Sequence, residues 1–464
     1  MNTFFNFKKY KFNNIVLDKY QTKAVLCKSD NYLVVAGAGS GKTLTIVAKV
    51  NYLIENNINP QNILCISYTN ETVNSLKKSL EKNNLKIDVK TFHKLSLDIL
   101  NKSYNISNNN LLEYIIEEFF ESIIYQDKTY LLLDFININY VKKIILSFIS
   151  RLKALNYDEN YLLFLLKNKN IKTDDKILIV FAFKIFIIYQ NELKSENKID
   201  FDDMISLATK KVEKLKLFRY SYIIIDEYQD TSRSKYLLIK AIIDKFNVKI
   251  MAVGDDYQSI YSFNGCDLSL FLKFKKLFNK SKIIKLKNTY RNPNDIVEIS
   301  KRFIAKNRNQ ITKSLKSNKY INNSLNIVYI NNEEEALNKI ISKYDNIMVI
   351  GRNNKDIDKY KDKSFNKDIT FLTAHSSKGL EKENVIILNV IDDNLGFPNK
   401  INNNDIFSYL ADFNQLEEER RLFYVAITRA KNKVIIFTKK NKESVFVKEL
   451  IKDYKRKIKI FYLD

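Results

Sequence analysis

The stretch Ala36-Gly37-Ala38-Gly39-Ser40-Gly41-Lys42-Thr43 decides how the N-terminal part of the chain folds. It follows a short apolar run, Tyr32–Val35, and precedes Leu44–Ala48, which has the pattern of the first turns of a helix. A buried strand, a loop of small residues and a helix are the context of a phosphate-binding loop. The backbone N–H groups of such a loop wrap a triphosphate, and larger side chains would obstruct that approach. The stretch therefore predicts a nucleoside triphosphate site.

Two side chains in this stretch have expected roles, and one residue departs from the usual pattern. Lys42 would reach the β- and γ-phosphates, and Thr43 would hold Mg²⁺. The N-terminus of the following helix would favour the negative charge. Ala36 stands where the strict pattern has Gly. The alternative, a chance Gly/Ala turn before a helix, is disfavoured by the Gly-Lys-Thr ending and the preceding strand.

Length and composition describe a globular protein with several domains. A chain of 464 residues is too long for one hydrophobic core and suggests two to four domains. Apolar residues at 45% exclude an intrinsically disordered protein. The net charge of +24 favours a polyanionic partner, with nucleic acid as the first candidate. Abundant Lys, Asn, Ile and Tyr also fit an A+T-rich coding bias, so composition alone leaves both explanations open.

Cysteine usage and hydropathy argue against disulfides, a signal peptide and a membrane span. The three cysteines lie far apart and have no metal or redox spacing, which favours a reduced, cytoplasmic protein. The N-terminus lacks an uninterrupted apolar segment. The most apolar run, Ile177–Tyr189, is interrupted by Lys184 and is shorter than the roughly 20 residues that a membrane span needs. We expect a buried helix there. Neither His93 nor His375 has a partner for a metal site.

Alternating strand-like and helix-like segments predict an α/β fold in two tandem units. The strands expected in the first unit are Tyr32–Val35, Ile63–Thr69, Asp88–Phe92, Tyr222–Asp226, Lys249–Gly254 and Ile283–Leu286. Those expected in the second unit are Leu325–Ile330, Ile347–Ile350, Ile369–Thr373, Val385–Val390 and Val434–Thr438. Inside the first unit, between the strands Asp88–Phe92 and Tyr222–Asp226, an all-helical insertion is expected with helices at Leu111–Ile124, Tyr140–Leu155 and Asp174–Leu193. Two tandem α/β units suggest a ligand cleft between them.

The run Ile223–Glu227 is an apolar strand that ends in two carboxylates. At the carboxyl end of a strand, Asp226 can hold Mg²⁺ beside the phosphate loop. Glu227 can then orient and deprotonate the attacking water. Apolar strands often end in acidic residues, so this signal becomes strong only together with the phosphate loop upstream.

The continuation of this strand, Asp226–Thr231, resembles the second motif of superfamily 1 helicases of the UvrD/Rep/PcrA type. Other stretches resemble further motifs of that family in the expected order: Leu17–Val25, Ser67–Asn70, Thr91–His93, Val253–Tyr261, Asn288–Arg291, Thr373–Glu381 and Glu417–Ala430. The resemblance runs from residue 17 to about residue 440, except that the helical insertion matches only by position.

This resemblance implies an ATP site between the two units. Gln21 would read the adenine edge, Tyr290 would stack on the base, and Glu381 would contact the sugar. The residues expected to bind ATP are Gln21, Ala36, Gly37, Ala38, Gly39, Ser40, Gly41, Lys42, Thr43, Tyr290 and Glu381. The side chains expected to act in hydrolysis are Lys42, Asp226, Glu227, Gln258, Arg291 and Arg429, with Mg²⁺ held by Thr43 and Asp226.

Three of these expected side chains face the γ-phosphate. Gln258 would sense this group, and Arg291 and Arg429 would contact it from the second unit. Guanidinium groups there would neutralise the charge that develops during phosphoryl transfer. Because they come from the opposite unit, ATP would close the cleft and hydrolysis would reopen it.

The resemblance also implies a single-strand site. The residues expected to contact nucleic acid are Thr69, Asn70, Thr91, Phe92, His93, Tyr261, Phe263 and His375. Aromatic rings beside small polar residues suit base stacking, which tolerates any sequence. Outside this motif context, core packing would be the better explanation for each ring. Phe263 and Asn264 stand where the family commonly has Trp and Arg, so stacking is expected to persist while a polar contact is lost.

The family architecture implies two RecA-like P-loop NTPase motor domains. We expect motor domain 1A at residues 1–102 and 198–287, a helical insertion 1B at 103–197, and motor domain 2A at 288–464. The family has a second helical insertion, 2B, inside the second motor. Here Arg352 is followed too soon by Ile369 to leave room for a domain of that size.

The implied function is an ATP-dependent DNA helicase or translocase in DNA repair, replication or recombination. Movement 3′→5′ on single-stranded DNA rests on the resemblance alone. The expected partners are single-stranded DNA, junctions of single and double strands, and a protein that replaces the regulation by 2B. The alternatives are an RNA-directed motor and a helicase-like ATPase subunit of a larger assembly, such as a phage-defence complex.

Overall fold

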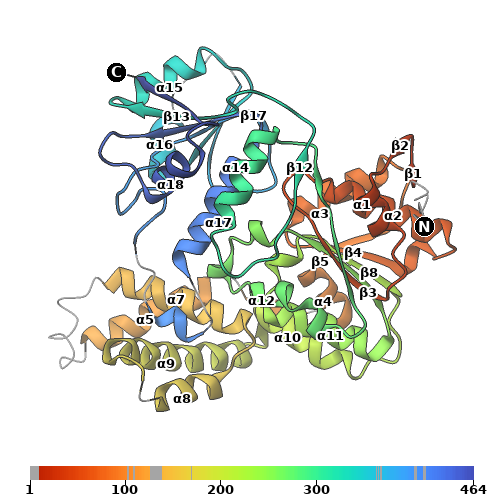
Figure 1. Cartoon of the computed structure of the whole chain (residues 1–464). Coiled ribbons are helices and arrows are strands. Elements are labelled where there is room, and N and C mark those ends of the chain that lie inside the picture. Colours follow the sequence, from red (N-terminus) through yellow and green to blue (C-terminus); the bar gives the residue numbers. More distant parts are fainter. Residues whose placement is uncertain are drawn as a thin grey trace.

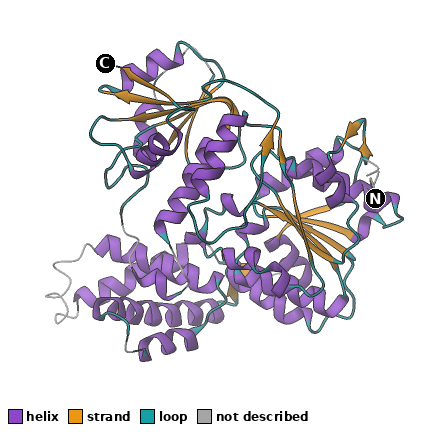
Figure 2. Ribbon diagram, viewed as in Figure 1, coloured by secondary structure: helices purple, strands orange, loops and turns teal. Residues whose placement is uncertain are grey.

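The computed structural model of the chain describes residues 10–101, 104–107, 110–125, 138–168, 170–361, 363, 365, 368–401, 405–410 and 414–463. Two six-stranded sheets, each flanked by helices, make up two units, and a bundle of helices lies beside them (Figure 1, Figure 2). In Figure 1 the first sheet lies at the right, the second at the upper left and the helical bundle at the lower left.

The first sheet is formed by parallel strands. They are β3 (Asn31–Val35), β4 (Ile63–Ser67), β5 (Asp88–Thr91), β8 (Tyr222–Ile225), β9 (Lys249–Gly254) and β10 (Lys282–Lys285). Their order is β10-β3-β9-β8-β4-β5. Alternate residues of β3 enter opposite cores, with Leu33 and Val35 on one face and Tyr32 and Val34 on the other, as the period of two in a strand requires.

Helices cover both faces of this sheet. One face carries α1 (Lys19–Val25), α2 (Lys42–Glu55) and α3 (Asn70–Glu81). The other carries α4 (Phe92–Leu100), α10 (Phe201–Val212), α11 (Arg233–Phe246), α12 (Leu268–Leu272) and α13 (Phe274–Leu277). Short elements lie around them: β1 (Lys11–Phe12), β2 (Ile15–Val16), η1 (Pro60–Asn62), η2 (Tyr228–Asp230), η3 (Asp256–Gln258) and η4 (Ser262–Asn264).

The second sheet is also parallel and is built from the C-terminal part of the chain. Its strands are β13 (Leu325–Ile330), β14 (Ile347–Gly351), β15 (Ile369–Thr373), β16 (Lys382–Ile387), β17 (Ala430–Thr438) and β18 (Lys459–Leu463), in the order β15-β14-β16-β17-β13-β18. One face packs against α14 (Asn294–Ile304), α17 (Gln415–Ile427) and α18 (Val445–Tyr454). The other packs against α15 (Glu333–Ile341) and α16 (Asn354–Lys361). The short strands β11 (Asn288–Thr289) and β12 (Lys316–Ser317) pair beside the first unit (Figure 1). The predicted fold class, two α/β units in tandem, is confirmed.

The helical bundle has its own hydrophobic core. It contains α5 (Asn110–Tyr125), α7 (Ile138–Ala154), α8 (Glu159–Lys167) and α9 (Thr173–Ser195). The strands β6 (Asn105–Ile106) and β7 (Lys198–Ile199) pair where the chain enters and leaves the bundle. The apolar run Ile177–Tyr189 lies within α9. Among the described residues, no helix is long and apolar enough to cross a membrane.

A short segment from the second half of the chain, η5 (Asp405–Tyr409), completes this core. Ile406 is fully buried among the bundle side chains, and Leu410 is almost so. The Tyr409 hydroxyl donates a hydrogen bond to Asp175 Oδ2 at 2.9 Å, and the Tyr161 hydroxyl donates to the Tyr409 carbonyl at 2.7 Å. The bundle is therefore attached to both halves of the chain.

Several expected strand boundaries were wrong by a few residues, and a helix cap and a backbone angle explain two of these differences. β5 ends at Thr91 and Phe92 begins a helix, because the Thr91 hydroxyl accepts a hydrogen bond from the Lys94 N–H and caps α4. β16 ends at Ile387 instead of residue 390, because Asn389 has a φ of 54° and interrupts the extended backbone. α8 and β18 were not expected from the sequence. The domain boundaries at residues 102, 197 and 287 stay predictions.

The packing of η5 predicts a loss of stability on truncation. Because Ile406 is fully buried, Ile406→Ala should lower the free energy of unfolding by about 2–5 kcal/mol. Denaturant unfolding followed by circular dichroism measures this change. Ile401→Ala is the control, because Ile401 precedes the same segment and is 46% exposed. Equal losses for the two variants would mean that η5 does not stabilise the bundle.

Candidate nucleotide and nucleic-acid site

The phosphate-binding loop lies at the carboxyl edge of the first sheet, between β3 and α2. Gly39 and Gly41 have φ values of 68° and 79°, a region that favours glycine. Gly41 precedes α2, and no side chain caps the first N–H groups of this helix. Uncapped N–H groups at a helix N-terminus are a ready site for phosphate. The local geometry therefore fits the predicted loop, with Lys42 and Thr43 at the start of the helix.

Segments of the second half of the chain lie directly on this loop. The Thr289 hydroxyl donates to the Ala38 carbonyl at 2.7 Å, and the Tyr290 N–H donates to the Gly39 carbonyl at 2.9 Å. A Cβ atom on Gly39 would lie 2.4 Å from Arg291 Cβ. A Cβ on Gly37 would lie 2.3 Å from Leu315 Cδ1. Glycine at these positions thus permits close contact between the two halves as well as the approach of phosphate.

The residues expected at the base, Gln21 and Tyr290, lie at one rim of the loop. Gln21 Nε2 donates to the Ser40 carbonyl at 3.2 Å, and Asp18 caps α1 in a box with Gln21. The Tyr290 hydroxyl donates to Asp18 Oδ2 at 2.7 Å, while the ring is 60% exposed. An exposed ring beside the loop can stack on a base. This arrangement brings Gln21 and Tyr290 to the same side of the loop.

The two carboxylates after β8, Asp226 and Glu227, have pKa values shifted in opposite directions. Lys42 Nζ lies 2.6 Å from both carboxylate oxygens of Glu227. Burial opposes ionisation of Glu227, but Lys42 and Lys378 outweigh it and hold its pKa well below the ordinary value. Burial and the charge of Glu227 raise the pKa of Asp226 to about 6. A bound triphosphate would compete with Glu227 for the Lys42 ammonium. Once Lys42 contacts the phosphates, the pKa of Glu227 would rise, and its carboxylate would be a stronger base than in the pair with Lys42.

Thr43 and Asp226 stay the expected ligands of Mg²⁺: Thr43 is the second residue of α2, and Asp226 directly follows β8. Magnesium at nucleotide sites is bound by one or two carboxylates together with phosphate oxygens and waters. Among the residues that the structure describes, no group of three or more His, Cys, Asp or Glu side chains could hold a metal ion. One hydroxyl and one carboxylate are a donor set that would suit Mg²⁺ bound together with nucleotide phosphates. When bound, it would neutralise charge on the β- and γ-phosphates.

Arg429 reaches from the second unit to the first. Its side chain is 1% exposed, and Nη2 donates to Gln258 Oε1 at 3.0 Å. Burial and the neighbouring charge of Arg291 lower the pKa of Arg429 to about 9. Arg291 pairs with Glu381 at 2.6 Å. A buried guanidinium with a second, partly buried guanidinium nearby would be stabilised by an anion, which is what a γ-phosphate supplies.

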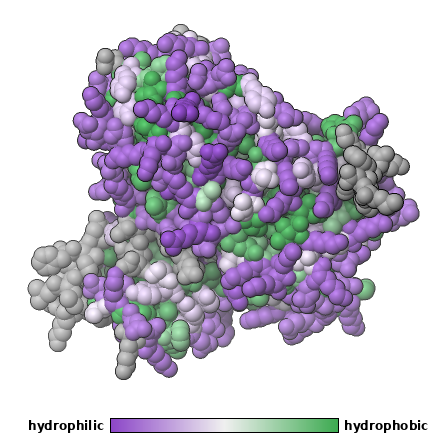
Figure 3. Space-filling model, viewed as in Figure 1, coloured by the Kyte–Doolittle hydropathy of each residue, from purple (hydrophilic) through white to green (hydrophobic). Residues whose placement is uncertain are grey.

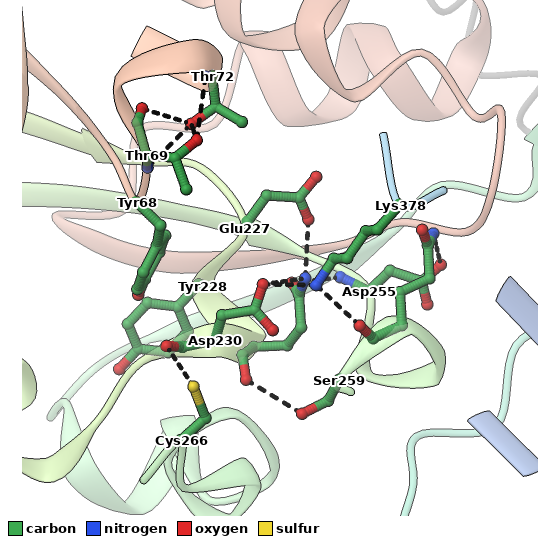
Figure 4. Close-up of polar contacts among 12 residues, drawn as sticks. Tyr68, Thr69, Thr72, Glu227, Tyr228, Asp230, Asp255, Ser259, Cys266 and Lys378 are labelled. Carbon is green, nitrogen blue, oxygen red and sulfur yellow. Dashed lines mark hydrogen bonds and ion pairs between the residues drawn. The ribbon is translucent and has the colours of Figure 1, made fainter. Parts of the chain in front are cut away.

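The bonds behind the loop join the two units further (Figure 4). Lys378 Nζ lies 2.5 Å from Asp230 Oδ2 and donates to the Gln258 carbonyl at 2.9 Å. Gln229 Nε2 donates to Glu227 at 2.7 Å, and Gln229 Oε1 accepts from the Asp255 N–H at 2.9 Å. A continuous set of polar contacts therefore links the nucleotide loop with residues of the second unit.

A cavity of about 760 Å³ lies between the bundle and the two units, and its wall includes Phe263 and His375. Phe263 and His375 have ring centroids 5.5 Å apart, and both lie within about 6 Å of Tyr261. Phe263 is 45% exposed. The basic side chains on the wall are Lys143, Arg151, Lys235 and Arg352. Rings and cations around one cavity suit a single nucleic-acid strand.

The face in Figure 3 is mostly hydrophilic, and hydrophobic side chains gather over the first sheet.

The other expected strand contacts lie at the carboxyl ends of β4 and β5. Thr69 caps α3 and Thr91 caps α4, so their hydroxyls already accept backbone N–H bonds. Asn70 is the first residue of α3. His93 lies 5.1 Å from Phe201, measured between ring centroids.

The expected stacking surface on Phe92 is not present in this arrangement. The ring is 1% exposed and packs against Tyr68 at a centroid distance of 5.4 Å. The correction follows from the helix start at Phe92, which directs the ring into the core between α4 and the sheet. Lys235 lies 5.1 Å from the Tyr68 ring, so a cation sits nearby.

Sequence reasoning missed several polar side chains of the site. Lys378 lies inside the quoted stretch Thr373–Glu381, so its position in a motif was a usable signal. Gln229 lies inside the stretch Asp226–Thr231, so its position in a motif was a usable signal as well. Arg352 and Lys235 carry no local pattern that separates them from the many other basic residues.

Two models of known protein families match this chain. The family model described as "UvrD/REP helicase N-terminal domain" matches residues 17–279, and the one described as "UvrD-like helicase C-terminal domain" matches residues 353–441. The first match alone covers more than half of the chain. The chain belongs to the UvrD/REP helicase family.

Individual relatives in this family share about a third of the sequence or less. The ATP-dependent DNA helicase Rep of Buchnera aphidicola subsp. Acyrthosiphon pisum is 32% identical over 84% of this chain and 60% of its own length. The DNA helicase II of Rickettsia typhi is 30% identical over 72% of this chain and 51% of its own length. DNA helicase IV of Escherichia coli is 26% identical over 94% and 70%, respectively. The chain thus spans 60% or less of the length of the Rep and helicase II relatives.

The two histidines predict an acid-sensitive stability. Burial, together with Lys235, lowers the pKa of His93 to about 4. Burial, with Arg352 and Lys378, lowers the pKa of His375 to about 4. Histidine in an unfolded chain titrates near 6.5, so their stabilising effect is complete above pH 6.5 and is lost as the pH falls towards 4.

A His93→Gln/His375→Gln double variant should therefore lose less stability than the wild type between pH 6.5 and pH 4.5. Denaturant unfolding at several pH values measures the difference. The variant removes the groups that take up protons on unfolding. Parallel pH profiles for the two proteins would contradict the burial argument.

Proposed function

We propose that this protein is an ATP-driven motor that moves 3′→5′ along single-stranded DNA and unwinds duplexes. The observation that carries the proposal is the contact between Arg429 of the second unit and Gln258 beside the phosphate loop of the first, at 3.0 Å. A γ-phosphate bound there would touch both units. Nucleotide state would then set the angle between the units, which is what movement along a strand requires.

The chemistry assigns one task to each side chain around the phosphates. Lys42 would hold the β- and γ-phosphates, and Thr43 and Asp226 would hold Mg²⁺ beside them. Glu227 accepts a proton from the attacking water once Lys42 has turned to the nucleotide. Arg291 and Arg429 neutralise the charge that develops on the γ-phosphate.

The strand side follows from the cavity between the bundle and the units. Phe263 and Tyr261 offer rings to bases, and His375 contributes a neutral imidazole near pH 7. The relatives are named DNA helicases, which favours DNA as the substrate. Residues 1–102 and 198–287 form motor domain 1A in this proposal, 103–197 the insertion 1B, and 288–464 motor domain 2A.

A second candidate is a helicase-like ATPase that works within a larger assembly. Between β14 and β15 the described residues contain one helix, α16, where the family was expected to carry the 2B insertion. A protein partner would then supply regulation at junctions of single and double strands. Unwinding by the isolated protein at a rate that a partner does not change would exclude this candidate.

The polarity test addresses the proposed function directly. Strand displacement and ATP hydrolysis are measured on duplexes with a 3′ tail or a 5′ tail, made of DNA or of RNA. We expect displacement with the 3′-tailed DNA alone, and stimulation of ATPase by single-stranded DNA above that by matched RNA. Displacement from the 5′-tailed substrate would overturn the direction, and preference for RNA would overturn the substrate.

The arginine contact predicts a large kinetic effect. Arg429→Lys should lower the DNA-stimulated kcat by about 10³–10⁵-fold, because a lysine ammonium does not reproduce the planar guanidinium at a phosphate. Steady-state ATPase assays measure it. Arg420→Lys is the control: Arg420 lies on α17, the helix that ends just before Arg429, and pairs with Glu449 within the second unit. A comparable loss in the control would show that the helix, not the γ-phosphate contact, is sensitive.

A further inference from the structure

Lys313 is a buried cation to which neither the sequence motifs nor the proposed chemistry assigns a task. It lies between α14 and β12, in a run where residues 313, 315 and 317 are buried and 312, 314 and 316 are exposed. Its side chain is 1% exposed. This segment passes from the second unit over the first, and its Leu315 lies on Gly37 of the phosphate loop.

The Lys313 ammonium contacts two carboxylates of the first unit. It is paired with Asp255 Oδ1 and lies 2.7 Å from Asp256 Oδ1, and both carboxylates are fully buried. The ammonium also lies 3.8 Å from the centroid of the Tyr257 ring. The backbone of the same segment adds a bond from the Ile311 N–H to Asp256 Oδ2 at 2.6 Å. The lysine is therefore held on several sides.

Asp255 in turn decides how Gln258 is oriented. Asp255 Oδ2 accepts a hydrogen bond from Gln258 Nε2 at 2.6 Å, and Gln258 Oε1 accepts from Arg429 at 3.0 Å. A carboxylate accepts only and a guanidinium donates only, so one orientation of the amide satisfies both partners. The reverse orientation would place N–H groups against Arg429 and an oxygen against Asp255.

We propose that Lys313 is a positioning residue for Gln258: it fixes the Asp255 carboxylate, and Asp255 fixes which end of the Gln258 amide faces Arg429. The proposal rests on the proposed function, because it gives Lys313 a part in sensing the γ-phosphate. Without Lys313, two buried carboxylates would lie side by side without their cation. Asp255 would then take up a proton or turn to another cation, and the Gln258 amide would lose its fixed partner.

The test must separate positioning from simple neutralisation of buried charge. Lys313→Met leaves both carboxylates unpaired and can destabilise the fold for that reason alone. The Lys313→Met/Asp256→Asn double variant removes one positive and one negative charge, so the net charge of the cluster is unchanged. The Asn oxygen can still accept the Ile311 N–H bond. Lys316→Met is the matched control, because Lys316 lies in the same segment and is exposed.

Each variant is compared with the wild type in thermal unfolding and in ATPase assays with and without single-stranded DNA. For the double variant we expect cooperative unfolding, a KM for ATP within about threefold of the wild type, and a DNA-stimulated kcat lower by about 10- to 100-fold. That factor is typical of the loss of one hydrogen bond to a charged group. The control should match the wild type in all three quantities.

Two results would overturn the proposal. A double variant with wild-type kcat would mean that Lys313 only balances charge. A double variant that fails to unfold cooperatively, or that loses ATP binding together with kcat, would mean that Lys313 is a structural residue. If DNA does not stimulate even the wild type, the proposed function is wrong. The comparison is then made on basal kcat, and equal basal values would contradict the role of Lys313.

Discussion

The phosphate-binding loop and the second half of the chain are in close contact, and this contact determines how the two units are placed. Thr289 and Tyr290 bond to carbonyls of the loop, and Leu315 lies against Gly37. A side chain at Gly37 or Gly39 would collide with these neighbours. One side of the loop therefore faces the second unit, and a nucleotide bound on the other side would be coupled to the arrangement of the two units.

Charges across this contact are distributed unequally. The buried cations Arg429, Lys378 and Lys313 come from the second half of the chain. Two of them pair with carboxylates of the first unit, Asp230 and Asp255. When one partner of a buried ion pair moves away, the other charge stays buried and unpaired, and the protein is strongly destabilised. The contact therefore favours a few discrete arrangements of the two units over a continuous range of arrangements. A nucleotide adds negative charge on the first-unit side and would strengthen the same contact.

Much of the fold could be predicted because it depends on local patterns. The apolar runs Tyr32–Val35 and Ile347–Ile350 lie within buried parallel strands, and the helical spacing at Asp174–Leu193 lies within α9. The Phe92 ring was placed wrongly, because one helix cap decides whether it faces the core or solvent. Lys313 could not be found, because its partners lie far away in the sequence and a lysine among 77 basic residues carries no local signal.

If the two units close around the γ-phosphate, the distance between them changes with the bound nucleotide, and spin labels can measure that distance. Spin labels at Leu217 and Tyr462, exposed positions on the first and second units, would be introduced after replacement of the three native cysteines. With single-stranded DNA and a non-hydrolysable ATP analogue, we expect one narrow distribution of distances, which shifts to longer distances or broadens with ADP. The same distribution with both nucleotides would contradict a motor whose two units close around the γ-phosphate.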